Sequence, residues 1–198
     1  MHAQEQQTEA LGYVVPNAWL GKCLWQALNQ ASQVEILAPA SINQVEFQQE
    51  AVQLTGEANG EPLALTSQLL ALVDGGSSNL KQQLGIANST HDYQQTVVFS
   101  KLELSQPHNN WAYERFTSAG ALALLPLNTR EMAVVWTQTR EAAAKTLAAS
   151  KQENLFNLQQ LFGNQAGQFI DLGELHTYPL RKIRAKEQVR SKLVLLGN

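Results

Sequence analysis

The chain has 198 residues, of which 44% are hydrophobic and 16% are charged, so it can bury a core and is not a disordered segment. Its single cysteine, Cys23, excludes an internal disulfide and indicates a reducing compartment. The net charge is −3, yet six of the 14 basic residues lie between Arg181 and Lys192. The acidic remainder argues against nucleic-acid binding. The basic segment is typical of a solvated strand pair, and less often of a contact with phosphate or a lipid headgroup.

The first third of the chain predicts a helix followed by a hairpin. Apolar residues recur at helical spacing over 18–30, which predicts an amphipathic helix. A short buried strand is expected at 34–37. Asn59-Gly60 is a strong hairpin signal because both positions of that turn need a positive φ, so the return strand is expected at 63–66.

A continuous apolar run over 69–73 predicts a strand covered on both faces, and it ends at Asp74-Gly75. Glycine lets the backbone approach a ligand closely, and Ser77 and Ser78 are candidate N-caps for a short helix. Ligands of open α/β sheets lie at the carboxyl edge of the strands. By itself the pattern is more typical of a plain turn than of a site.

The remainder predicts an antiparallel meander, a helical segment with a break near Ser150, and closing strands. The expected strands are 93–104, 111–117, 121–127, 132–137, 169–172, 176–180 and 193–196, and the helical segment is 140–162. The fold class is α+β, with a mixed or antiparallel sheet domain bearing helices and part of a split α/β domain.

The chain lacks the common self-contained catalytic and nucleotide-binding motifs. It contains no G-x-G-x-x-G, no G-x-x-x-x-G-K-[ST] and no G-x-S-x-G sequence. The four histidines have no metal-ligand spacing and Cys23 stands alone, so no metal site is expected. No catalytic acid, base or nucleophile can be assigned.

Seven short stretches keep a recognisable order and spacing: Leu11–Val15, Val73–Gly75 with Ser78, Glu114–Thr117, Gly120–Leu127, Val135-Trp136, Tyr178–Leu180 and Val194–Asn198. Together they resemble the class A flavin monooxygenases of the para-hydroxybenzoate hydroxylase type, in the branch that hydroxylates the ring in ubiquinone biosynthesis. The resemblance implies that a G-x-G-x-x-G segment lies upstream of Met1 and that a second flavin-binding turn begins at Gly197-Asn198. The chain alone is then expected to be inactive and to bind FAD poorly.

The resemblance also implies an activity, domain boundaries and cofactor contacts. The parent enzyme would use FAD, NADPH or NADH, and O₂ to hydroxylate a polyprenyl-phenol. Residues 1–90 would be part of the FAD-binding domain, 91–185 the substrate-binding sheet domain, and 186–198 a return strand to the FAD-binding domain. Asp74, Gly75, Lys22 and Ile42 would contact the cofactor; Lys22 stands where Arg or Gln is usual and Val73 where Ala is usual.

The meander would cover the substrate, and the expected pocket residues are Arg115, Phe116, Leu125, Pro126, Trp136 and Tyr178. Peripheral membrane contact, contact with other ubiquinone-biosynthesis proteins and self-association are the partner expectations, in the cytoplasm or at the inner face of the membrane. Two alternatives stay open: a non-catalytic binding or assembly module with the same fold, and a relative that hydroxylates a soluble aromatic acid.

Overall fold

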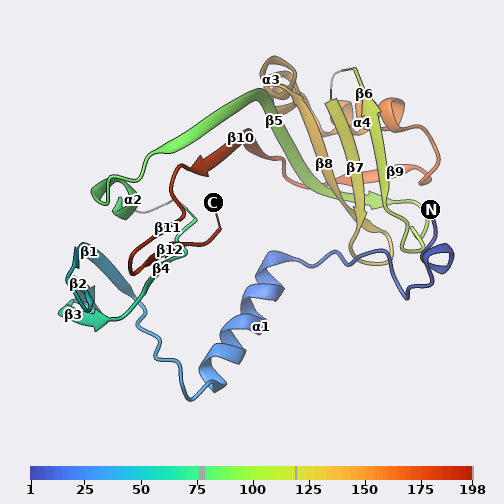
Figure 1. Cartoon of the computed structure of the whole chain (residues 1–198). Helices are drawn as coiled ribbons and strands as arrows, with labels where there is room; N and C mark the ends of the chain where they lie inside the picture. Colours follow the sequence, from blue (N-terminus) through green and yellow to red (C-terminus); the bar gives the residue numbers. More distant parts are fainter. Residues whose placement is uncertain (76–78, 119, 198) are drawn as a thin grey trace. The chain divides into compact units, whose positions relative to one another are not determined.

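The computed structural model describes residues 1–75, 79–118 and 120–197 (Figure 1). The candidate caps Ser77 and Ser78, and the Asn198 of the last motif, lie outside the described residues. The helical elements are η1 (Ala3–Gln6), α1 (Asn17–Gln30), α2 (Leu80–Gln83), α3 (Arg140–Ala148) and α4 (Lys151–Phe162). The strands are β1 (Ala40–Phe47), β2 (Val52–Ala58), β3 (Glu61–Ser67), β4 (Leu70–Leu72), β5 (Asn88–Leu104), β6 (Tyr113–Thr117), β7 (Gly120–Pro126), β8 (Glu131–Thr139), β9 (Phe169–Leu172), β10 (His176–Ala185), β11 (Val189–Arg190) and β12 (Leu193–Leu195).

The fold is therefore mixed α and β, dominated by sheet, and it divides into two compact units. The first unit comprises Met1–Lys22 and Asp92–Arg181, and the second comprises Cys23–His91 and Lys182–Asn198.

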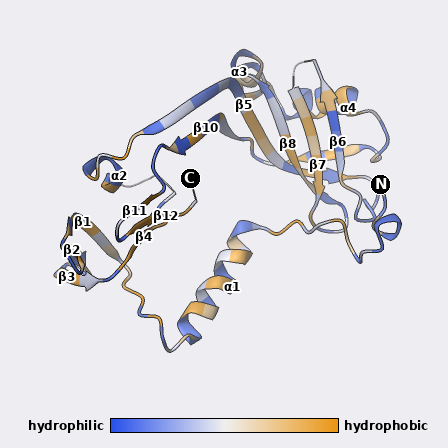
Figure 2. Ribbon diagram, in the orientation of Figure 1, coloured by the Kyte–Doolittle hydropathy of each residue, from blue (hydrophilic) through white to orange (hydrophobic). Residues whose placement is uncertain are grey.

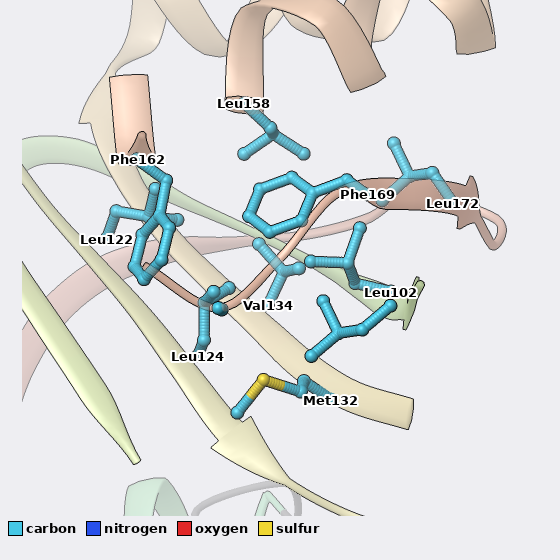
Figure 3. Packing of buried hydrophobic residues seen from close by; sticks show 11 residues of the cluster. Leu102, Leu122, Leu124, Met132, Val134, Leu158, Phe162, Phe169 and Leu172 are labelled. Carbon is cyan, nitrogen blue, oxygen red and sulfur yellow. The ribbon is translucent and has the colours of Figure 1, made fainter. Parts of the chain in front are cut away.

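The first unit is built on a six-stranded sheet with the order β10-β5-β8-β7-β6, in which β9 also pairs with β5. Neighbours from β5 to β6 are antiparallel, as the meander predicts. Alternate side chains of these strands point to one face, where Leu102, Leu122, Leu124 and Val134 are at most 3% exposed. Helix α4 covers this face with Leu158 and Phe162 (Figure 3). Each such buried side chain contributes roughly 1.5–3 kcal/mol of hydrophobic stabilisation.

The helical segment after β8 breaks where the sequence predicts. Helix α3 ends at Ala148, and Ser150 caps α4 by accepting a hydrogen bond from the backbone N of Glu153 at 3.2 Å. A serine at this position satisfies one of the free N–H groups of the new helix. Helix α4 ends at Phe162, and Gly163 follows with a φ of +82°.

The second unit contains two three-stranded sheets. Strands β1, β2 and β3 form an antiparallel ribbon, and the turn at Asn59-Gly60 has φ values of +53° and +84°, which confirms the predicted hairpin. The other sheet has the order β11-β12-β4, and β12 runs parallel to β4. Its core includes Leu72, Leu80 and Leu193.

Two predicted elements of the first 40 residues differ from expectation, one in its burial and one in its secondary structure. The predicted helix over 18–30 forms as α1, but none of its residues is buried. The predicted strand at 34–37 was wrong, because these residues form no ladder and Val34 and Leu37 remain 45% and 37% exposed. A short apolar run becomes a strand only when a neighbouring strand pairs with it.

Candidate functional site

Two glycine turns lie side by side at one edge of the small sheet of the second unit. Leu72 of β4 is opposite Leu195 of the parallel strand β12, and the backbone N of Leu196 donates to the carbonyl of Leu72 at 3.0 Å. The chain therefore leaves both strands at the same carboxyl edge. Gly75 follows with a φ of +64° and Gly197 with a φ of +87°. Apart from their chain neighbours, no atom of the described residues lies within 4 Å of the place that a Cβ would take at either glycine.

This edge holds two of the four predicted cofactor residues, Asp74 and Gly75. Asp74 is half-buried directly before the Gly75 turn. The paired glycines fit a nucleotide cofactor, because backbone without side chains lets a phosphate or ring approach closely.

Ile42 belongs to the same unit. Its half-buried side chain packs against the core cluster that contains Leu72. Strand β1 is an edge strand with a bulge between Ile42 and Gln44. An edge strand presents unpaired backbone groups, which is the kind of contact predicted for this residue.

Lys22 is the fourth predicted cofactor residue. It lies on the exposed helix α1 and is grouped with the first unit. Its role at the cofactor stays a prediction.

The first unit has a second candidate surface on the side of its sheet that faces away from α4. We call it the open face. The strand β7, which lies between β8 and β6, is largely hydrophobic (Figure 2). Phe99 and Phe116 are 43% and 78% exposed there, in contrast to the buried residues of the opposite face. Its hydrophobic residues are Val97, Phe99, Phe116, Ala121, Ala123, Leu125, Ala133, Val135 and Tyr178. Lys101 and Glu114, opposite Ala133 and Ala123, are charged residues of the same face.

The ladder registers divide the six predicted pocket residues equally between the two faces. Directly opposite residues share a face. Phe116 is opposite Ala121, and Leu125 is opposite Ala133, so both lie on the open face. Tyr178 joins them, because His176, two residues before it on β10, stacks on Phe99.

The other three predicted pocket residues lie on the face that α4 covers. Trp136 is opposite the buried Leu122 and packs against the core, and Pro126 is opposite the buried Met132. Arg115 is also opposite Leu122, and its Nη1 donates a hydrogen bond to the carbonyl of Phe162. A guanidinium at this place satisfies a carbonyl of the last turn of α4.

Phe99 and Val135 also belong to the open face, although they were not among the predicted pocket residues. The signal was present in β5, where Val98, Ser100, Leu102 and Leu104 are buried and the residues between them are not. This strict alternation assigns Phe99 to the opposite face, next to Val135 in the ladder.

Asp92 is one of two carboxylates of the first unit, with Asp171, whose pKa is lowered by its contacts. The backbone N of Gln94 donates to its Oδ1 at 2.8 Å, Arg140 contacts its Oδ2, and the Nε of Arg181 lies 3.7 Å away. The Gln94 hydrogen bond first, and the two arginines with it, hold the pKa of Asp92 below its ordinary value of 3.8. The site is an exposed ion pair that joins β5, α3 and β10 within this unit.

The described residues contain neither a cluster of metal ligands nor a helix that could cross a membrane. No group of three or more His, Cys, Asp and Glu side chains there could hold a metal ion. None of the helices described combines the length and the apolar character needed to cross a membrane.

Comparison with known proteins gives relatives over the whole chain. It is 26% identical over 197 residues to the ubiquinone hydroxylase UbiL of Rhodospirillum rubrum, covering 100% of the chain and 45% of that protein. It is 24% identical over 196 residues to 3-demethoxyubiquinol 3-hydroxylase of Escherichia coli, covering 99% of the chain and 49% of the relative. The chain thus spans about half the length of these curated relatives.

The fold is also found among solved structures. The p-nitrophenol 4-monooxygenase PnpA of Pseudomonas putida superposes with a TM-score of 0.69 at 15% identity, covering 91% of this chain and 46% of that one. The model of the FAD binding domain family matches residues 2–198. The chain therefore belongs to the FAD binding domain family, whose fold it shares with flavin-dependent monooxygenases.

Proposed function

We propose that the protein containing this chain is an FAD-dependent monooxygenase that hydroxylates a polyprenyl-phenol precursor of ubiquinone. The observation that carries the proposal is the cluster of aliphatic and aromatic side chains on the open face, in a chain whose relatives are named ubiquinone hydroxylase and 3-demethoxyubiquinol 3-hydroxylase. Such a surface suits a ligand that combines an aromatic ring with a hydrocarbon tail.

The cofactor is assigned to the paired glycine turns of the second unit. Gly75 and Gly197 leave the backbone uncovered for the nucleotide, and Asp74 is the polar residue beside them. Ile42 would contribute a backbone contact, and Lys22 a charged one. When bound, FAD reduced by NADPH or NADH supplies the activation of O₂ for transfer of one oxygen atom to the ring.

The substrate is assigned to the open face, where this chain binds and orients the ring and keeps water away from it. Phe116, Leu125 and Tyr178 are the proposed contacts, together with Phe99. Apolar side chains at these positions replace water around the reacting ring. Arg115 and Trp136 would act indirectly, by fixing α4 and the core beneath the same strands.

The two alternatives receive less support. A soluble aromatic acid would favour an arginine-rich pocket, yet the predicted arginine, Arg115, lies on the covered face and is engaged by a carbonyl of α4. A non-catalytic module would not explain why relatives over the whole chain carry the names of hydroxylases.

The test is an assay of the full-length gene product with FAD, O₂ and a prenylated phenol, with NADPH and NADH compared separately. The expected result is a product heavier by one oxygen atom, with one NAD(P)H oxidised and one water released per turnover. Oxidation of NAD(P)H without ring hydroxylation, at any prenyl length, would overturn the proposed substrate. Equal turnover of a carboxylated, unprenylated phenol would favour the soluble-acid alternative.

A further inference from the structure

Strand β10 carries a row of cationic side chains where it runs through the second unit. Ala185 faces the core of that unit and is 7% exposed, whereas Lys182 and Arg184 are exposed. Because side chains of a strand alternate, Lys182 and Arg184 share the face that points away from the core. Lys186 follows directly, and its backbone N donates to the carbonyl of Ala87 at 2.9 Å, which holds the chain there. We call these three residues the cationic row.

The nearest carboxylate in sequence does not neutralise the cationic row. Glu187 accepts hydrogen bonds from Nε and Nη2 of Arg190 at 3.0 and 2.5 Å. That contact lowers the pKa of Glu187 and keeps its charge engaged with Arg190. Within the described residues, Lys182, Arg184 and Lys186 have no ion pair and no side-chain hydrogen bond.

The cationic row also stands out against the negative charge of the rest of the second unit. From Cys23 to His91 the second unit has one basic residue, Lys81, against six acidic ones. The positive charge of this unit is therefore concentrated in the closing segment, and three of its cations are free to meet an anionic partner.

The spacing of the row favours a surface over a single anion. Alternate residues of a strand are about 6.7 Å apart, so Lys182 and Arg184 are separated by about that distance, and Lys186 follows just beyond the end of β10. Cations spread along the chain in this way can each meet a different headgroup of a flat array. We propose that the cationic row docks the protein on a membrane surface that contains anionic phospholipids. The inference rests on the proposed function in one respect, since a polyprenyl-phenol resides in the membrane.

The experiment measures binding of the full-length protein to vesicles by co-sedimentation, with neutral phosphatidylcholine vesicles and vesicles containing anionic phosphatidylglycerol. The expected result is salt-sensitive binding to the anionic vesicles only. Single, double and triple substitution by glutamine (Lys182→Gln, Arg184→Gln, Lys186→Gln) should weaken binding about 5-fold per residue, since a basic residue near such a surface contributes about that factor.

Two further proteins make the result decisive. The charge-preserving triple variant, Lys182→Arg with Arg184→Lys and Lys186→Arg, should bind like the wild type. The matched control Arg130→Gln/Lys145→Gln removes two exposed cations of the first unit and should leave binding unchanged. The proposal is overturned if the glutamine variants bind normally, if the control loses as much, or if the protein binds neutral vesicles equally. Saturation of the row by inorganic phosphate or by RNA without vesicle binding would also overturn it. Vesicle binding needs no turnover, so its failure and failure of the hydroxylase assay are separate results.

Discussion

The ring of Phe99 on β5 stacks on the ring of His176 on β10, with centroids 5.3 Å apart and planes inclined by 29°. Phe99 alternates with the buried Val98 and Ser100, so the stacked pair lies on the open face rather than in the core. This contact extends the apolar surface from β5 to the neighbouring strand β10 and brings Tyr178 onto it. The proposed substrate surface therefore runs across every strand from β10 to β6.

Replacing Phe116 with alanine should impair substrate binding and leave stability nearly unchanged. Phe116 is 78% exposed, so its removal creates no cavity. The expected result is a higher KM for the prenylated phenol with a free energy of unfolding within about 0.5 kcal/mol of the wild type. The comparison is Leu122→Ala on the covered face, where a fully buried side chain is lost and about 2–5 kcal/mol of stability with it. An unchanged KM for Phe116→Ala would contradict the assignment of the open face.

Replacing Gly75 with alanine should weaken FAD binding. Gly75 has a φ of +64° and open space at its Cβ position, so a methyl group would occupy the approach that we assign to the cofactor. Gly85 provides a matched control, because it has a φ of +67°, equally open space and no place at the glycine edge. Both alanine variants should lose similar stability, of order 1 kcal/mol, through the same backbone strain. Titration of the full-length apoprotein with FAD should show a loss of affinity in Gly75→Ala alone; equal loss in both would count against the site.

Local patterns in the sequence predicted most of the secondary structure. The Asn59-Gly60 turn, the break at Ser150 and the meander all follow from short-range rules of turn, cap and alternation. The strand expected at 34–37 failed because apolar composition does not supply a pairing partner. The resemblance to flavin monooxygenases added the Asp74-Gly75 edge, which composition alone left as a plain turn.

The division of the predicted pocket residues between two faces required the ladder registers. Arg115 and Phe116 are adjacent in sequence and therefore point to opposite sides of β6. Which side α4 would cover depends on contacts of high sequence separation, such as that of Arg115 with Phe162. No local pattern in the β6 sequence specifies that choice.

The free energy of unfolding should fall at acid pH, in part because Asp92 becomes protonated. The folded state holds the pKa of this carboxyl below 3.8, so its stabilising effect is complete above that value and disappears as pH falls through the lower folded pKa. Asp92→Asn should therefore be less stable than the wild type near pH 7, by a modest amount because the ion pairs are exposed. The difference should vanish once the pH falls below the folded pKa of Asp92.

Thermal unfolding of both proteins at several pH values measures this difference in stability. Glu9→Gln serves as the control, since Glu9 is an exposed carboxylate without a hydrogen bond or ion pair in the described part of the chain. A constant difference between Asp92→Asn and the wild type at every pH would show that Asp92 does not stabilise the fold through its charge.

Replacing Gly120 with alanine should destabilise the large sheet. Gly120 begins β7 with a φ of +147°, and a Cβ built on it would lie 2.0 Å from the carbonyl oxygen of Thr137 on β8. No side chain fits at that distance from a backbone atom, so the strands would have to separate where the open face begins. The expected loss is about 2–4 kcal/mol in the free energy of unfolding, from overpacking together with backbone strain. Denaturant titration measures this loss. The control is Gly12→Ala, where no described residue beyond the chain neighbours lies within 4 Å and φ is not positive, and it should differ little from the wild type. If Gly120→Ala were as stable as Gly12→Ala, β7 and β8 would not approach each other as closely as the structure has them.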